Sequence, residues 1–291
     1  FILAGVLVGF CVGVTGVGGG SLMTPILISL FRIEPHIAIG TDLLYAAISK
    51  FCGSLVHAKK MNIVWPIVIW LAVGSIPASF ATHWVLENFL SQSTHYKAVL
   101  TMVLGFMLTL TGVSIVFRGS IENFFNRYRS QEQLDMSADL SRSNLSAQAK
   151  EKRFLIIFMG IVLGVFVTLS SVGAGAFGIM ALVLMFPNLP MIRIIGSDVV
   201  HAVLLTLVAG LGYMSAGNVD YVLLGWLLCG SIPAIVVGTL VSSRLPEKII
   251  RKILGLTLCV IGINFMINPV KSKPVSVETA SVVVVQQQNN S

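Results

Sequence analysis

Charged residues are scarce in this chain: Asp, Glu, Lys and Arg make up 11% of its 291 residues, whereas hydrophobic residues make up 55%. Soluble globular proteins carry roughly 25% charged residues, so the composition excludes an ordinary soluble domain. It indicates an integral membrane protein with many transmembrane segments. The net charge of +7 does not indicate a nucleic-acid-binding protein, because the basic residues stand at the ends of apolar runs, as topology determinants do.

Cysteine is scarce as well, and its four copies lie inside apolar runs at spacings that fit neither a disulfide framework nor a metal site. We expect them to be small buried apolar side chains, and we predict no metal and no cofactor. The chain begins at Phe1 rather than at Met, so we expect an N-terminal piece to precede it, and the sequence shows no cleavable signal.

Two of the apolar runs have an unusual length. Residues 1–31 and 154–186 are too long for one helical crossing of a membrane and too short for two. Each run is interrupted by small residues, at Gly18–Gly20 and at Gly173–Gly175. We therefore predict, in each run, a full helix, a break and a short helix.

The two halves of the chain carry the same motifs in the same order, at an offset of 155 or 156 residues. The matched blocks are Val17–Gly20 with Val172–Gly175, Ile39–Asp42 with Ile195–Asp198, and Gly74–Ala78 with Gly230–Ala234. Colinear blocks at one offset indicate a duplication. We predict an all-α polytopic membrane protein that is built from two homologous repeats.

The basic residues at the run ends favour five crossings in each half and inverted repeats. Four crossings in each half, with the short helix re-entrant, stay open, so the prediction is 8 to 10 transmembrane segments. The expected organisation is a first transmembrane repeat at 1–117, a polar cytoplasmic linker at 118–153, a second repeat at 154–270 and a flexible tail at 271–291.

Ionisable residues inside the apolar runs are few, and each is a functional candidate because a charge in the membrane is costly. Asp42 and Asp198 are repeat equivalents that follow a glycine and a hydroxyl residue, which is typical of a helix N-terminus or of a proton or cation site. Lys50 either extends to the surface or offers a positive charge to an anion. His201 either packs as a neutral side chain or titrates near neutral pH. Asp42, Asp198 and His201 are the candidates for proton coupling.

The glycine breaks are the candidates for a binding site. Free N–H groups at the beginning of a short helix bind anions, aided by the helix dipole. Broken backbone is tolerated in a membrane only where protein buries it or where it lines a polar cavity, and paired breaks are typical of transporters. The alternative is close helix packing. The predicted substrate-binding residues are Gly18, Gly19, Gly20, Ser21, Gly40, Thr41, Lys50, Gly173, Ala174, Gly175, Gly196 and Ser197, and the predicted gating kinks are Pro77 and Pro233.

The motifs GVTGVGGGSLMTPIL, AIGTDLL, HAKKMN and GSIPAS resemble those of the sulfite exporter TauE/SafE family, and the resemblance covers residues 1 to about 268. It implies a transporter of small sulfur-containing anions, such as sulfite, thiosulfate or organosulfonates, in a bacterial inner membrane. In the second half Ala174 replaces a glycine and Ala176 replaces a polar residue. We therefore expect the substrate to contact the Gly18–Ser21 side more closely.

Together these features predict a secondary transporter that works by alternating access. Its expected partners are the anion, a proton or another coupling ion, and membrane lipid, but no nucleic acid; no oligomeric state is predicted. The alternative is a channel or a metal-cation transporter in which Asp42 and Asp198 bind the ion. An enzyme is not expected, because the polar groups are duplicated and no Ser/His pairing occurs at catalytic spacing.

Overall fold

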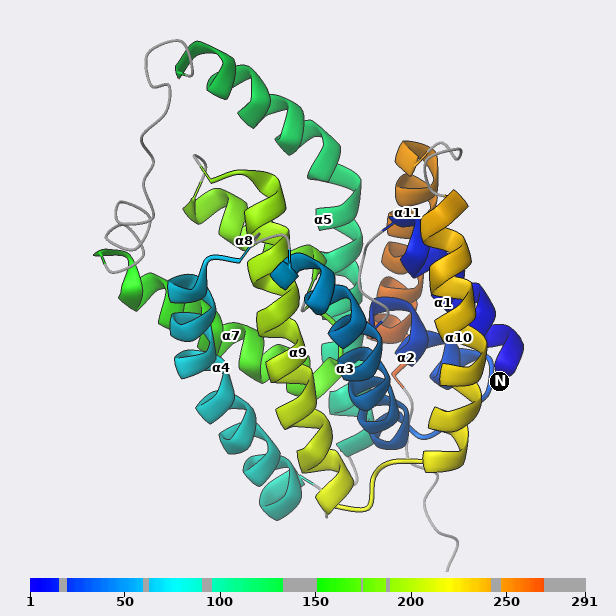
Figure 1. Cartoon of the computed structure of the whole chain (residues 1–291). Helices are drawn as coiled ribbons and strands as arrows, with labels where there is room; N and C mark the ends of the chain where they lie inside the picture. The colour runs from blue at the N-terminus through cyan, green and yellow to red at the C-terminus, as the bar shows by residue number, and fades with distance from the viewer. Residues whose placement is uncertain are drawn as a thin grey trace, which may run out of the picture.

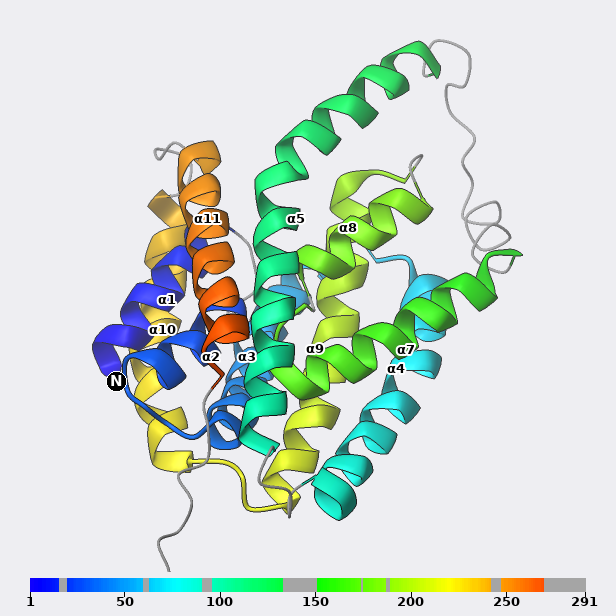
Figure 2. The same ribbon diagram turned by 180° about the vertical axis from the view of Figure 1, so that it is seen from behind.

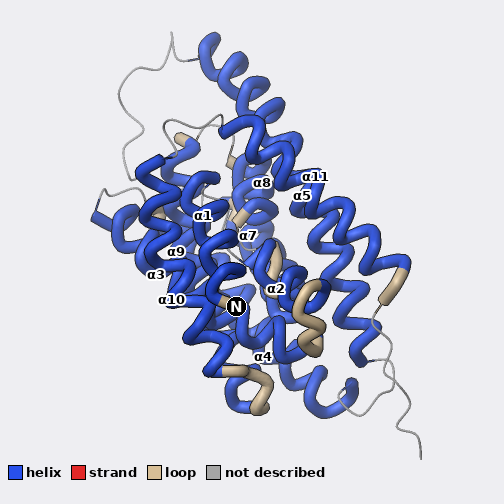
Figure 3. The backbone as a smooth tube through the Cα atoms, turned by 90° about the vertical axis from the view of Figure 1, so that its right-hand side faces the viewer, coloured by secondary structure: helices blue, strands red, loops and turns tan. Residues whose placement is uncertain are grey.

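The computed structural model describes residues 1–15, 20–59, 63–90, 96–132, 151–173, 175–186, 189–241 and 247–269. Within these ranges all regular secondary structure is helical, as the predicted all-α fold requires (Figure 3). The first half contains α1 (Ile2–Thr15), α2 (Gly20–Ser29), α3 (Pro35–Lys59), α4 (Trp65–Val85), the π-helix η1 (Leu86–Leu90) and α5 (Tyr96–Glu132). The second half contains α7 (Arg153–Ser170), α8 (Ala176–Met185), α9 (Met191–Ser215), α10 (Tyr221–Val241) and α11 (Glu247–Ile267).

Six helical segments in the described part of the chain are long and apolar enough to cross a membrane. They are Trp65–Phe89, Tyr96–Phe117, Arg153–Ser170, Met191–Ser215, Tyr221–Val241 and Ile249–Ile267. The apolar segment Ile2–Val14 is shorter. The protein is therefore an integral membrane protein, whereas a total of eight to ten crossings stays a prediction.

The two short helices follow the glycine-rich blocks. Both α2 and α8 have 10 residues, which corresponds to about 15 Å, or half of the hydrocarbon core. Neither can cross a membrane alone. Each packs on the long helix that follows it, α2 on α3 and α8 on α9.

The long helices α3 and α9 lie side by side in the middle of the bundle (Figures 1 and 2). On one side of them α4 packs against α7, and on the other side α1 packs against α10. The helix α5 packs along α11. Each of these pairs joins one helix from the first half to one from the second, so the halves are interlocked.

Glycines allow the backbones of these helix pairs to touch. Gly5 on α1 lies against the carbonyl of Leu227 on α10, and Gly160 on α7 lies against the carbonyl of Leu71 on α4. A methyl group on either glycine would collide with backbone that cannot move away easily. The two contacts use positions that correspond to each other in the predicted repeat.

The helix α5 continues beyond the membrane-length segment as far as Glu132 (Figure 1). The first part of the predicted polar linker is therefore helical. The reason lies in its composition, because residues 120–132 contain no proline or glycine and include several good helix formers. Residues 133–150 of the linker and the predicted tail from 271 lie outside the described residues.

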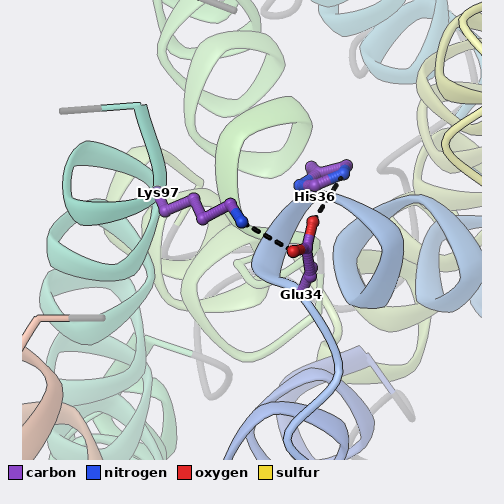
Figure 4. A network of polar contacts seen from close by, with 3 residues as sticks. All are labelled: Glu34, His36 and Lys97. Carbon is purple, nitrogen blue, oxygen red and sulfur yellow. Dashed lines mark hydrogen bonds and ion pairs between the residues drawn. The ribbon is translucent and has the colours of Figure 1, made fainter. Parts of the chain in front are cut away.

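Charged groups fix the loop between α2 and α3 to the beginning of α5 (Figure 4). Nζ of Lys97 lies 2.6 Å from Oε1 of Glu34, and Nε2 of His36 lies 3.3 Å from Oε2 of the same carboxylate. The hydrogen bond from Lys97 lowers the pKa of Glu34 below its ordinary value. This contact ties the beginning of α3 to the beginning of α5.

Candidate functional site

Asp42, on α3, lies with no exposed surface against the first turns of α2. Thr24 donates two hydrogen bonds to its Oδ2, one from the backbone N–H at 3.2 Å and one from the hydroxyl. Ser171, which follows α7 with a left-handed φ of 58°, faces the same carboxylate with its hydroxyl. The N-terminal part of α2 therefore holds a carboxyl oxygen that belongs to the chain itself.

Asp198, on α9, has the matching place in the second half. It is buried, and its Oδ1 lies against the backbone of Gly178 in the first turn of α8. A methyl group at Gly178 would collide with that oxygen, so glycine is what lets the carboxylate approach the helix. Each short helix thus has an aspartate carboxylate near its beginning.

The hydroxyls of Thr41 and Ser197 connect the two halves. Oγ1 of Thr41 accepts a hydrogen bond from the N–H of Asp220 at 3.1 Å, and Oγ of Ser197 accepts one from the N–H of Val64 at 2.9 Å. Both hydroxyls are fully buried. In this conformation they hold the loops that lead into α10 and α4, and their predicted contact with substrate stays a prediction.

A second pair of matched contacts lies along α3 and α9. Oγ of Ser75 on α4 lies 2.8 Å from Nε2 of His201 on α9. Tyr45 has the corresponding position on α3, and its hydroxyl faces Ser231 on α10. Nδ1 of His201 is buried and has no hydrogen-bond partner among the described residues. The contacts of α9 with α4 and of α3 with α10 therefore place polar groups at the centre of the bundle.

Lys50 brings a positive charge to this polar centre. It lies eight residues beyond Asp42 on α3 and is only partly buried. Both Asp42 and Asp198 are within electrostatic range of its ammonium group, and so is His201. Lys50 thus interacts electrostatically with Asp42 and Asp198, whereas its role as the charge for an anion stays a prediction.

Part of the predicted glycine breaks, namely Gly18, Gly19 and Ala174, lies outside the described residues. Gly173 and Gly175 have φ angles of 112° and 138°. Residues other than glycine rarely adopt these backbone angles, so the second break depends on both glycines. The backbone conformation alone therefore explains the glycines at this break, whether or not a ligand approaches it.

The other predicted residues lie within regular helix. Gly20 begins α2, and Ser21 follows it as a buried side chain. Gly196 lies inside α9. Pro77 and Pro233 lie inside α4 and α10, where each removes one backbone hydrogen bond. Their part in gating stays a prediction.

Two hydroxyl residues at this site, Thr24 and Ser171, were missing from the predicted set. Each stands close to a glycine block, Thr24 shortly after Gly20 and Ser171 shortly before Gly173. Their proximity to the glycine blocks is the feature of the sequence from which they could have been predicted as site residues. In the described part of the chain no group of three His, Cys, Asp or Glu side chains is placed to hold a metal ion.

Comparison with known proteins decides the family. The family model described as sulfite exporter TauE/SafE matches residues 1–265. The chain belongs to this family. It is 37% identical over 222 residues to the probable membrane transporter protein YjnA of Bacillus subtilis, which covers 76% of this chain and 81% of the relative. It is 29% identical over 227 residues to the probable membrane transporter protein YdhB of the same organism, at 77% and 81% coverage.

An archaeal relative, the probable membrane transporter protein MJ0441 of Methanocaldococcus jannaschii, is 28% identical over 131 residues, or 42% of this chain and 47% of the relative. No solved structure matches the chain. The resemblance seen in the sequence motifs is thereby confirmed. This TauE/SafE protein is a membrane transporter and not an enzyme.

Proposed function

We propose that this TauE/SafE transporter moves a small sulfur-containing anion, such as sulfite, thiosulfate or an organosulfonate, by alternating access. The family description supports the substrate class. The observation that carries the proposal is the position of Asp42, whose buried carboxylate accepts two hydrogen bonds from Thr24 at the beginning of α2. An oxygen of sulfite or of a sulfonate is an anionic acceptor like the carboxylate, so it can accept hydrogen bonds from the same donors.

The anion binds between the beginnings of α2 and α8. Ser21 and Thr24 make the first-half side richer in hydroxyl donors than the second, where Ala176 and Gly178 begin α8. Lys50 supplies the positive charge that a buried anion needs. The predicted closer contact on the Gly18–Ser21 side follows from this difference.

The two halves act as inverted repeats that rock against each other around the site. Matched contacts between the halves support this proposal. The hydrogen bond from Asp220 to Thr41 corresponds to the one from Val64 to Ser197. Contacts of this kind form or break as a set when one half moves, and that makes two discrete states possible.

A proton accompanies the anion in this mechanism. With Asp42 and Asp198 ionised and Lys50 charged, the polar centre carries one net negative charge, which repels an anion. Protonation of either aspartate removes that excess. The proton also weakens the hydrogen bonds from Thr24, since bonds to a charged acceptor are roughly twice as strong as neutral ones.

A binding screen on the purified protein tests the substrate class. The shift in melting temperature is recorded with sulfite, sulfate, thiosulfate, taurine, sulfoacetate and simple carboxylates. We expect a sulfur-containing anion to stabilise the protein and the Thr24→Val variant to lose that shift. Thr257→Val is the matched control, because this exposed hydroxyl bonds only the carbonyl of Ile253 in its own helix. Equal shifts with carboxylates and sulfur anions would contradict the proposal.

A further inference from the structure

Buried hydroxyls line the contacts of α4 with α7 and α9. Oγ of Ser75 lies 2.8 Å from Nε2 of His201 at the centre of the bundle. One turn further along α4, Oγ of Ser79 lies 2.8 Å from Oγ1 of Thr168 on α7. The hydroxyl of Tyr213 on α9 donates to the carbonyl of Thr168 at 3.0 Å. All five side chains are buried, so the groups form a polar run inside the bundle.

The outer end of this run reaches solvent at the end of α4. The ring of His83 lies 5.5 Å from the ring of Tyr213. Nε2 of His83 lies 3.7 Å from Oε2 of Glu87, whose side chain is 49% exposed. Neither ring nitrogen of His83 has a hydrogen-bond partner among the described residues. Titratable groups therefore lie at both ends of the polar run, His201 at the inner end and His83 with Glu87 at the outer end.

The corresponding interface in the other half does not carry such a run. Ser75 has a counterpart in Ser231, but four other members are replaced. Under the repeat offset the counterparts of Ser79, Thr168, His83 and His201 are Ile235, Gly13, Thr239 and Tyr45. There Ile235 and Gly13 interrupt the series, although Tyr45, Ser231 and Thr239 are polar. A polar run inside a membrane protein that the packing does not require indicates a function.

We propose that the run from Glu87 to His201 is a proton-access route between one membrane surface and the polar centre. The inference rests on the proposed coupling of transport to protons. A proton arrives at Glu87 and passes to His83. It then passes along the hydroxyls of Tyr213, Thr168, Ser79 and Ser75, each of which accepts a proton and releases its own; the carbonyl of Thr168 that Tyr213 contacts takes up no proton. His201 then receives a proton at Nε2 from Ser75 and releases one from Nδ1 toward the charged centre. No atom is consumed, and one proton is displaced.

Three links of the route are not direct bonds between hydroxyls. Ser75 and Ser79 stand one turn apart on α4, at a rise of about 5.4 Å, and the rings of Tyr213 and His83 meet without a hydrogen bond. The hydroxyl of Tyr213 donates to the carbonyl of Thr168 and not to its Oγ1, so this link also needs a bridge. A water molecule bridges a span of this size at little cost. The route thus consists of fixed hydroxyls joined at three points by water.

Other titratable groups surround both ends of the route. At the inner end, Lys50 of α3 is within electrostatic range of His201, and Asp198 precedes His201 by one turn on α9. Asp42 of α3 interacts with Lys50. At the outer end, Tyr96 of α5 is within electrostatic range of Glu87. The route therefore connects a surface carboxylate with the aspartates of both halves.

Proton exchange at His201 tests the route directly. The full chain, with nitrogen-15 in its histidines, is placed in lipid nanodiscs, and the exchange rate of the His201 ring proton with solvent is measured by NMR; His201→Gln identifies the signal. We expect Thr168→Val and Tyr213→Phe to slow this exchange at least about tenfold, or 1.4 kcal/mol in barrier. Thr239→Val is the matched control in the other half and leaves the rate unchanged.

Equal exchange rates in the wild type, Thr168→Val and Tyr213→Phe would overturn the route. Ser79→Ala, which removes a hydroxyl without adding volume, gives the same test if Thr168→Val lowers the yield of folded protein. Since the exchange is read without substrate, its result is independent of the proposed function. Anion exchange across liposomes at equal pH on both sides tests that function separately, and the route variants keep it at the wild-type rate.

Discussion

Thr24 and Asp42 join α2 to α3 through two hydrogen bonds to one carboxylate oxygen, Oδ2 of Asp42. A carboxylate without exposed surface needs such donors, because an unpaired buried charge is costly. Oδ1 of the same carboxylate has no hydrogen-bond partner among the described residues. A proton can therefore bind at Oδ1 while both bonds from Thr24 remain, and the site can change its charge without losing its geometry.

Asp42→Asn is expected to abolish the pH dependence of anion uptake. The amide oxygen still accepts from Thr24, so the fold is kept, but the side chain is neutral at every pH. Uptake by the wild type into liposomes falls from acidic to alkaline pH, because the ionised aspartate repels the anion. Uptake by the variant follows a flat profile. A variant that keeps the wild-type profile would show that Asp42 is not the coupling group.

Thr24→Val is expected to lower the free energy of unfolding by about 1–3 kcal/mol, because the buried carboxylate of Asp42 loses one donor. Unfolding in detergent, followed by circular dichroism, measures this loss. The loss is smaller when Asp42→Asn is already present, since the bond is then no longer charge-assisted. The same loss in both backgrounds would mean that Thr24 stabilises α2 independently of Asp42.

Gly178→Ala is expected to destabilise the protein although alanine is the better helix former by about 1 kcal/mol. The added methyl group collides with Oδ1 of Asp198 at the beginning of α8. Gly225→Ala on α10 is the matched control, because no atom lies within 4 Å of its added methyl group. The change in melting temperature is measured for both variants. Equal changes would contradict the contact between Asp198 and the first turn of α8.

Lys97→Met is expected to raise the pKa of Glu34 toward its ordinary value, because the hydrogen bond from Lys97 holds it down. The stabilisation from this pair is present above the ordinary pKa of the carboxyl and is lost as pH falls through the lowered value. Both side chains are partly exposed, so the loss is only about 0.2–1 kcal/mol and shrinks in high salt. Carbon-13 NMR of Glu34 measures the titration, and an unchanged pKa would contradict the assignment.

Several features of the fold were predictable because they depend on local sequence. Run length and glycine placement predicted a separate short helix in each half, and α2 and α8 are these helices. The partners of Asp42 and Asp198 were not predictable. Asp42 was expected either to stabilise the beginning of its own helix or to bind an ion, whereas it turns toward Thr24 on another helix. Only tertiary packing brings these groups together.

The hydroxyls at the centre show the same limit of local reasoning. Thr41 and Ser197 were chosen because each stands between a glycine and an aspartate. Their partners, the N–H groups of Asp220 and Val64, are 179 and 133 residues away in the chain. The helical extension of α5 was not predicted, because polar composition alone does not separate a helix from a linker.

Exchange of labelled anions by the purified protein in liposomes tests the central claim most directly. Liposomes loaded with one anion are diluted into labelled sulfite, thiosulfate or sulfoacetate, with phosphate, acetate and potassium as comparisons. The account predicts saturable exchange of a sulfur-containing anion, which Thr24→Val reduces at least about tenfold and Thr257→Val leaves unchanged. Potassium flux that depends on Asp42 and Asp198, without exchange of any sulfur-containing anion, would contradict it and support a cation pathway.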